Sequence, residues 1–303
     1  MKRSFVSPVR LAALVLSIVL FLTCSASAET VVASFYPVWL IALNLTDGIE
    51  EIDVRLLAPA DTGCLHDYQL QTSDMRSLSS ADLLLVNGAG MEAFLSSVYD
   101  AFPALPVVEA SEGIPLLDDV SPVSIGESET EHNAHIWLDP SLAALMAENL
   151  AEGMISVMPE YDEAIRRNLD SWSARMSSLD GLLKEELAPY QGADIITFHE
   201  AFPYFARAYG LNVAAVINKE PGETPTPAQM AELIALISDL GRPPLFVEPQ
   251  YEDISARTLA AETGAEVYTL DPVSSGPDVN PPLDYYETVM LQNMETLKTA
   301  LGN

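Results

Sequence analysis

The sequence predicts an α/β protein of two lobes, each with a parallel sheet flanked by helices, joined by one long rigid linker helix. Two observations support this fold class. Short apolar runs alternate with longer amphipathic stretches along most of the chain, and one helical stretch near the middle breaks that rhythm. Alternation of strands and helices is typical of parallel sheets, because each helix returns the chain to the edge where the next strand begins.

Eight short runs are predicted to be strands. They are nearly continuous in apolar residues rather than alternating, as expected for parallel strands buried on both faces. They cover residues 30–35, 53–58, 82–87, 106–110, 194–198, 212–217, 244–249 and 266–270. Among the amphipathic helices between them are residues 140–158 and 225–241, the latter opening with Pro and closing at Gly241.

Residues 159–187 are predicted to form one long helix that begins at Pro159 and ends before Pro189. A helix of this length would extend about 40 Å, longer than the usual connection inside a compact α/β unit. We therefore expect it to join a lobe of residues 29–158 to a lobe of residues 188–303, the alternative being a helix packed on one domain. Its apolar positions recur at helical spacing: Ile165, Leu169, Trp172, Met176, Leu179, Leu182 and Leu183.

The first 28 residues have the layout of a secretory signal peptide. A cationic start is followed by the apolar run 11–23 and by Ala-Ser-Ala at 26–28, and the apolar run is shorter than the ~20 residues of a spanning helix. A second interpretation attaches lipid to Cys24, although the residues before it fit a lipoprotein signal poorly. Both interpretations place the mature protein outside the cytoplasm, in the periplasm or at the cell surface.

Charge and cysteine content limit the possible partners. The formal net charge is −30, and removal of the cationic leader makes it more negative. Nucleic acid and anionic membrane surfaces need a basic face, so both are disfavoured as partners. A negative field concentrates cations, although it also simply keeps a secreted protein soluble. After cleavage only Cys64 remains, so no intramolecular disulfide can form and the fold depends on a hydrophobic core.

Four side chains stand where an α/β protein builds its binding site. His66 lies in a turn-rich loop after a predicted strand, His199 and Asp271 directly follow two others, and His135 stands at a helix entrance. Ligands bind beyond the carboxyl ends of parallel strands. Three imidazoles and one carboxylate suit four-coordinate Zn²⁺, whereas Mn²⁺ favours more oxygen. The spacing is not a compact metal motif, so the residues alone leave open whether these histidines bind metal.

Several longer segments carry a family resemblance. They occur in the order and approximate spacing of the zinc-uptake substrate-binding proteins of ABC transporters, the ZnuA-like branch of a family that also includes manganese binders. The resemblance runs from about Val31 to the C-terminus, and it implies two α/β lobes with one metal ion in the cleft between them, delivered to a membrane permease. The segments are VVASFYPVWLIA, LHDYQL, ADLLLVNGAGME, HIWLDP, FHEAFPYFARAYGL, FVEPQY and TGAEVYTLDP.

The resemblance also implies a ligand set. By position, the three histidine ligands of the family fall on His66, His135 and His199, and its C-terminal aspartate falls on Asp271. Manganese binders carry glutamate at the position of His199, so an imidazole there favours zinc. In zinc-specific members water partly replaces the aspartate, which leaves open whether Asp271 or water completes the site.

The chain departs from the family pattern at two places. Zinc members often carry a long loop rich in histidine and acids, but residues 124–133 are short and hold only His132, which we expect to belong to this loop and not to the metal site. Many relatives have Pro before the first histidine ligand, whereas Gly-Cys-Leu-His places Cys64 two residues before His66. Its thiolate would join or compete for zinc; the alternative is a small buried residue in a turn.

Glu200 and Glu248 are expected either to orient a ligand's other ring nitrogen or to be exposed. The expected function is a monomeric, non-catalytic zinc receptor. One alternative is a secreted zinc hydrolase with Glu200 as general base, although no HExxH pair is present and a carboxylate in the fourth position would close the site. Another is a manganese-binding or adhesin-type member of the same family.

Overall fold

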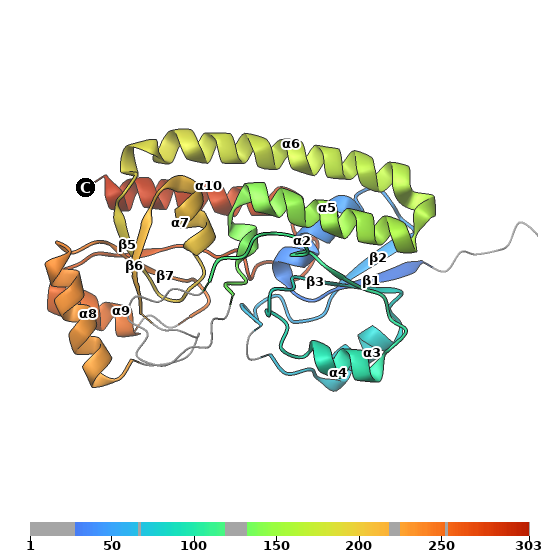
Figure 1. Ribbon diagram of the computed structural model, residues 1–303, viewed down its shortest axis with the longest axis horizontal. Coiled ribbons are helices and arrows are strands. Elements are labelled where there is room, and N and C mark those ends of the chain that lie inside the picture. Colours follow the sequence, from blue (N-terminus) through green and yellow to red (C-terminus); the bar gives the residue numbers. More distant parts are fainter. Residues whose placement is uncertain (1–27, 66–67, 119–131, 218–224, 252–253, 303) are drawn as a thin grey trace, which may run out of the picture.

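The structure of the protein is a computed structural model, shown in Figure 1. It describes residues 28–65, 68–118, 132–217, 225–251 and 254–302. The predicted signal peptide, apart from Ala28, and Cys24 lie outside these residues. None of the helices in the described part of the chain is both long enough and apolar enough to cross a membrane.

Two four-stranded sheets, each entirely parallel, form the centres of the two lobes. The first has the order β2-β1-β3-β4 and the second β6-β5-β7-β8, so both repeat one topology. All eight predicted strands are confirmed, with ends within two residues of the prediction. Their bounds are β1 Glu29–Ala33, β2 Ile52–Leu56, β3 Leu83–Val86, β4 Val107–Glu109, β5 Asp194–Thr197, β6 Asn212–Val216, β7 Leu245–Val247 and β8 Val267–Thr269.

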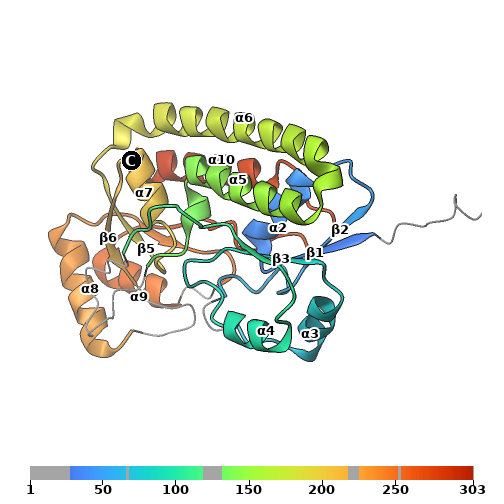
Figure 2. The same cartoon turned by 45° about the vertical axis from the view of Figure 1, so that its right-hand side comes forward.

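Helices cover both sheets, as Figures 1 and 2 show. Helices α3 and α4 lie on the outer side of the first sheet and α8 and α9 beside the second, while α5, α6 and α10 lie along the opposite side of the molecule. The α-helices are α2 Tyr36–Leu45, α3 Thr72–Ser79, α4 Leu95–Ala101, α5 Pro140–Val157, α6 Asp162–Leu187, α7 Pro203–Tyr209, α8 Pro227–Asp239, α9 Ile254–Thr263 and α10 Tyr285–Leu301. Three short 3₁₀ helices are η1 Ile136–Leu138, η2 Pro159–Tyr161 and η3 Ala188–Tyr190.

Helix α6 runs across the top of the molecule from one sheet to the other (Figure 1). It packs against α2, α5 and α10. Its buried side chains recur three or four residues apart for most of its length, which is the spacing of one helical face. They are Ile165, Trp172, Met176, Leu179, Leu183 and Leu187, whereas Leu182, at 40% exposure, lies on the solvent side. The predicted long helix and the two-lobe α/β fold class are confirmed.

A second segment crosses between the lobes. After β8 the chain returns to the first sheet, where Gly276 N donates to Ala60 O at 3.1 Å and Asn44 Nδ2 donates to Leu283 O at 3.1 Å. Helix α10 then packs along α6. The predicted lobe boundaries, residues 29–158 and 188–303, stay a prediction, but two crossings now tie the sheets together rather than one.

Candidate metal centre

Loops at the carboxyl ends of the strands position the candidate side chains. Cys64 stands in the loop after β2, His199 two residues after β5, and Glu248 directly after β7. His135 immediately precedes η1, and α5 then begins behind an N-cap in which Asp139 accepts a hydrogen bond from Ser141 N at 2.9 Å. These residues come from both lobes, so their approach depends on the packing of the two lobes together.

Cys64, His135 and His199 form one compact group. The distance from Cys64 Sγ is 3.2 Å to His135 Nε2 and 3.4 Å to His199 Nε2, and the two Nε2 atoms lie 3.2 Å apart. The imidazoles are 3% and 1% exposed, and the cysteine is half-buried. Their three donor atoms all lie within 4.8 Å of one another, which is close enough for one metal ion to bind all three.

Asn133 fixes the orientation of His135. Its Nδ2 donates to the backbone carbonyl of Glu200 at 2.7 Å, which leaves Oδ1 as the acceptor facing His135. That oxygen accepts from His135 N at 3.0 Å and lies 3.3 Å from Nδ1. The hydrogen-bond network therefore assigns the ring proton to Nδ1 and a bare lone pair to Nε2.

Glu248 fixes the orientation of His199. One carboxylate oxygen is in very short contact with His199 Nδ1, and the other accepts from Gln250 Nε2 at 2.9 Å. Burial of the ring lowers its pKa, but the charge of Glu248 and the contact with Cys64 raise it more, and the pKa of His199 lies well above its ordinary value. A carboxylate behind a histidine holds its tautomer and makes the other ring nitrogen a stronger metal ligand.

The Nε2 atoms of His135 and His199 point at a common position. Lone pairs only 3.2 Å apart repel unless a proton or a cation lies between them. Neutral imidazole nitrogen and thiolate sulfur are both ligands that zinc accepts. The group can therefore hold a borderline cation.

Asp271 lies near this group but is not a member of it. Its Oδ1 accepts from Val273 N at 2.8 Å, and Asn293 of α10 bonds to its backbone on both sides at 2.8 and 2.7 Å. Burial raises the pKa of Asp271 to about 6; the hydrogen bond from Val273 opposes this shift and the charge of Glu248 adds to it. A ligand role for Asp271 stays a prediction, as does that of His66, which lies outside the described residues.

His132 and Glu200 have other surroundings. His132 Nδ1 lies 3.2 Å from Asp118 Oδ1, with more than half of its side chain exposed, and its backbone forms an isolated antiparallel bridge to Asp118. It is not a member of the buried group. Glu200 is buried, and its carbonyl receives the hydrogen bond from Asn133. Its predicted orienting role stays a prediction.

Sequence reasoning missed Asn133, Gln250 and Gly63. Gly63 has φ +78°, and a Cβ there would lie 2.6 Å from the hydroxyl of Tyr251, whose ring packs edge-on against His199 with centroids 6.1 Å apart. Only glycine allows this approach without strain. The available signals were weak: an amide two residues before a candidate ligand, and a glycine beside the cysteine.

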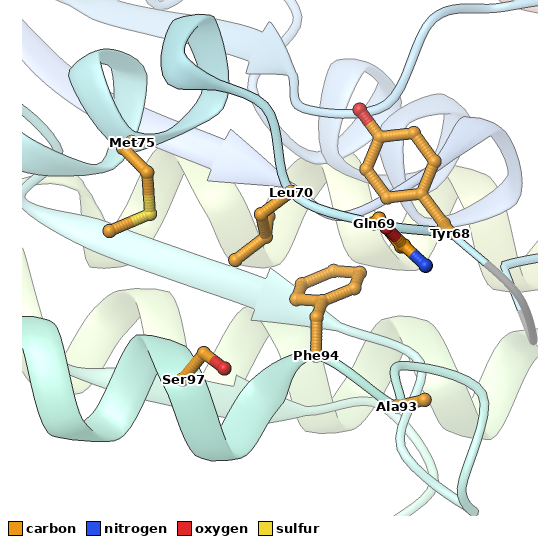
Figure 3. Close-up of a pocket in the computed structure, with 7 residues that line it drawn as sticks. All are labelled: Tyr68, Gln69, Leu70, Met75, Ala93, Phe94 and Ser97. Atoms are coloured by element: carbon orange, nitrogen blue, oxygen red, sulfur yellow. The ribbon is translucent and has the colours of Figure 1, made fainter.

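A separate pocket of about 540 Å³ opens on the first lobe (Figure 3). Tyr68 and Phe94 pack edge-on within it, with ring centroids 5.9 Å apart. None of its lining residues is a histidine, cysteine, aspartate or glutamate, so the pocket is not part of the metal centre. They are Tyr68, Gln69, Leu70, Met75, Ala93, Phe94 and Ser97.

Comparison with known proteins agrees with this chemistry. Residues 31–300 match the family described as "Zinc-uptake complex component A periplasmic". The high-affinity zinc uptake system protein ZnuA of Haemophilus ducreyi is 29% identical over 274 residues, covering 84% of this chain and 87% of the relative. The iron-binding protein YfeA of Yersinia pestis is 26% identical over 274 residues, covering 90% and 86%.

Solved structures share the fold. The substrate-binding protein FpvC of Pseudomonas aeruginosa, solved with Mn²⁺, has a TM-score of 0.81 at 24% identity, covering 91% of this chain and 99% of FpvC. The laminin-binding protein Lmb of Streptococcus agalactiae, described as an adhesin with metal-transporting activity, has a TM-score of 0.77 at 24% identity, covering 90% and 99%. Proteins of this fold thus carry names that refer to different metals and to adhesion.

Proposed function

The chain belongs to the family of the periplasmic zinc-uptake complex component A, and we propose that it captures Zn²⁺ outside the cytoplasm and delivers it to the permease of an ABC transporter. One observation carries this proposal. Two buried imidazoles from different lobes bring their Nε2 atoms within 3.2 Å of each other, and each ring is held by a partner on its Nδ1.

The donor atoms favour zinc over manganese. Mn²⁺ prefers oxygen ligands, whereas two imidazole nitrogens suit Zn²⁺. By resemblance, manganese binders carry a carboxylate at the position that His199 occupies here. We propose His135 and His199 as ligands on the grounds of this geometry, and His66 and Asp271 on the grounds of the resemblance.

Delivery needs a route for release. Helix α6 and the returning segment that leads to α10 both cross between the sheets, so wide hinge opening would have to distort two packed connections. We propose instead that docking on the permease rearranges the loops that carry the ligands, as a closed site of several ligands releases its ion slowly.

The proposed protein is a monomeric receptor and not an enzyme. Its expected location outside the cytoplasm is supported by the periplasmic designation of the family and by the predicted signal peptide. Lipid attachment at Cys24 remains the second possibility for how it is held there.

Metal titration and transport together test the function. Metal-stripped protein of residues 29–303 is titrated with Zn²⁺, Mn²⁺ and Fe²⁺ in competition with a chromophoric chelator, and we expect one tightly bound zinc per chain and weaker binding of the others. Proteoliposomes that contain the permease and ATPase of an ABC transporter from the same organism should then take up zinc only when the loaded protein is added. Binding of manganese more tightly than zinc, or zinc uptake that does not depend on the protein, would contradict the proposal.

A further inference from the structure

The third donor atom of the buried group belongs to a residue that the family's ligand set does not include. We propose that Cys64 binds the captured ion as a thiolate, which makes the site a mixed nitrogen and sulfur centre selective for thiophilic cations such as Zn²⁺. This inference rests on the proposed function, because it names a ligand of the same site.

The distances match a zinc ion bound by these three atoms. Tetrahedral zinc with bonds of ~2.0–2.1 Å to nitrogen and ~2.3 Å to sulfur separates two nitrogens by roughly 3.3 Å and a nitrogen from a sulfur by roughly 3.6 Å. The observed separations are 3.2 Å between the nitrogens, and 3.2 and 3.4 Å from sulfur to nitrogen. A flat three-coordinate ion needs wider spacing, so the ion would lie outside the plane of the three donors. One position of a tetrahedral shell then remains, and with Cys64 bound either His66 or Asp271, but not both, would fill it.

A pair of an imidazolium and a thiolate would account for the contact between His199 and Cys64, since Cys64 helps to raise the pKa of His199. A cation at the centre of the group attracts all three donors at once, including Nε2 of His135.

The fold holds Cys64 in this position from both sides. Leu65 is completely buried beside it, and Thr62 N closes a turn on Pro59 O at 2.9 Å. The backbone of Cys64 also hydrogen-bonds to Tyr251, which belongs to the other lobe and packs against His199. A residue that merely filled a turn would not need a contact from the opposite lobe.

Thiolate ligation would define the kind of ion that the site accepts. Sulfur is a soft donor that stabilises zinc and cadmium far more than manganese or magnesium. A thiolate beside two imidazoles would therefore favour soft cations more than a site of nitrogen and oxygen donors alone. The centre should bind Cd²⁺ about as well as Zn²⁺, and Mn²⁺ poorly.

Cobalt substitution tests the sulfur ligand directly. Protein of residues 29–303 has Cys64 as its only cysteine; it is reduced, stripped of metal and loaded with one equivalent of Co²⁺. We expect an intense sulfur-to-cobalt charge-transfer band in the near ultraviolet, absent from Cys64→Ser. Zinc affinity of Cys64→Ala should fall by more than the ~10–100-fold typical of residues that only support a ligand. His132→Ala is the matched control and should keep the band and the affinity.

A second measurement needs no variant. X-ray absorption of the zinc-loaded parent protein should show one sulfur at ~2.3 Å from zinc. Tight zinc binding that His135→Ala abolishes, but with no sulfur neighbour and no charge-transfer band, would overturn the role of Cys64 and leave zinc capture intact. If the parent binds no zinc, the proposed function fails first and this inference with it.

Discussion

The two imidazoles of the centre are held in different ways by the two lobes. On the first lobe, His135 faces the neutral amide of Asn133, whose own donor is fixed by the carbonyl of Glu200. On the second lobe, His199 faces the carboxylate of Glu248, itself anchored by Gln250. Both arrangements turn the Nε2 atom of the ring toward the centre of the group, but only the second places a buried negative charge behind the ring.

This difference separates two properties of a histidine ligand: the direction in which its ring points and the basicity of its Nε2 atom. An amide is enough to set the tautomer and the direction of the ring, whereas a carboxylate also raises the affinity of the ring for protons and for metal ions. His199 should therefore be the position at which protons and zinc compete, because its pKa is raised.

Removal of either ring should have the largest effect. We expect His135→Ala and His199→Ala each to weaken zinc binding by more than ~100-fold, beyond the range for a residue that only orients a ligand. Chelator competition at alkaline pH measures this loss. Unchanged zinc affinity in either variant would show that the substituted residue is not a ligand.

Removal of the charge behind His199 should have the next largest effect. Glu248→Gln should weaken zinc binding by about 10–100-fold at alkaline pH, because the ligand becomes less basic. A raised pKa means that protons displace zinc as the pH falls through it, so the variant, with a lower His199 pKa, should lose zinc at lower pH than the parent.

The pH profile of zinc affinity measures this shift. Asp118→Asn is the matched control, because it removes the carboxylate that faces the exposed His132 and should leave the profile unchanged. A Glu248→Gln profile identical to that of the parent would show that the carboxylate does not set the basicity of His199.

Placing a negative charge behind His135 should have a smaller effect on zinc binding. Asn133→Asp puts a carboxylate at the oxygen that lies 3.3 Å from Nδ1, which should raise the pKa of His135 and make zinc binding fall more steeply with decreasing pH. At alkaline pH the change should stay within about tenfold. An unchanged slope would contradict the assigned role of Asn133.

The smallest effect is expected at the neighbouring histidine. His132 is exposed and pairs with Asp118 at the surface, so His132→Ala should change zinc affinity by no more than about twofold, as for other surface substitutions. Isothermal titration against the parent measures it. A loss as large as that of His135→Ala would show that His132 takes part in the site.

Much of the fold was predictable because each lobe repeats a strongly patterned unit. The inner strands β1, β3, β5 and β7 are apolar runs buried on both faces, and α6 shows helical spacing along most of its buried side. The edge strands β2, β4, β6 and β8 are partly exposed, so the prediction of burial on both faces was wrong for them. The return of residues 272–284 to the first lobe was not predicted. That segment is rich in Pro and polar residues and has no periodicity, so its path is decided by tertiary contacts such as Asn44 with Leu283.

The candidate site was predictable only in part. His135 and His199 stand beside recognisable motifs at strand and helix ends, and the structure brings them together; that they bind zinc is our proposal. From the sequence, Cys64 is either a ligand or a turn residue, because its distance to the imidazoles depends on how two loops from different lobes pack. Asn133 and Gln250 act through single hydrogen bonds, which leave no pattern in a sequence.

Anomalous diffraction from a crystal of the zinc-loaded protein tests the central claim most directly. Data on both sides of the zinc absorption edge should show one strong peak per chain, at ~2.0–2.1 Å from Nε2 of both His135 and His199. A peak at the surface beside His132, or an empty position between the two rings in crystals that contain zinc, would contradict the account.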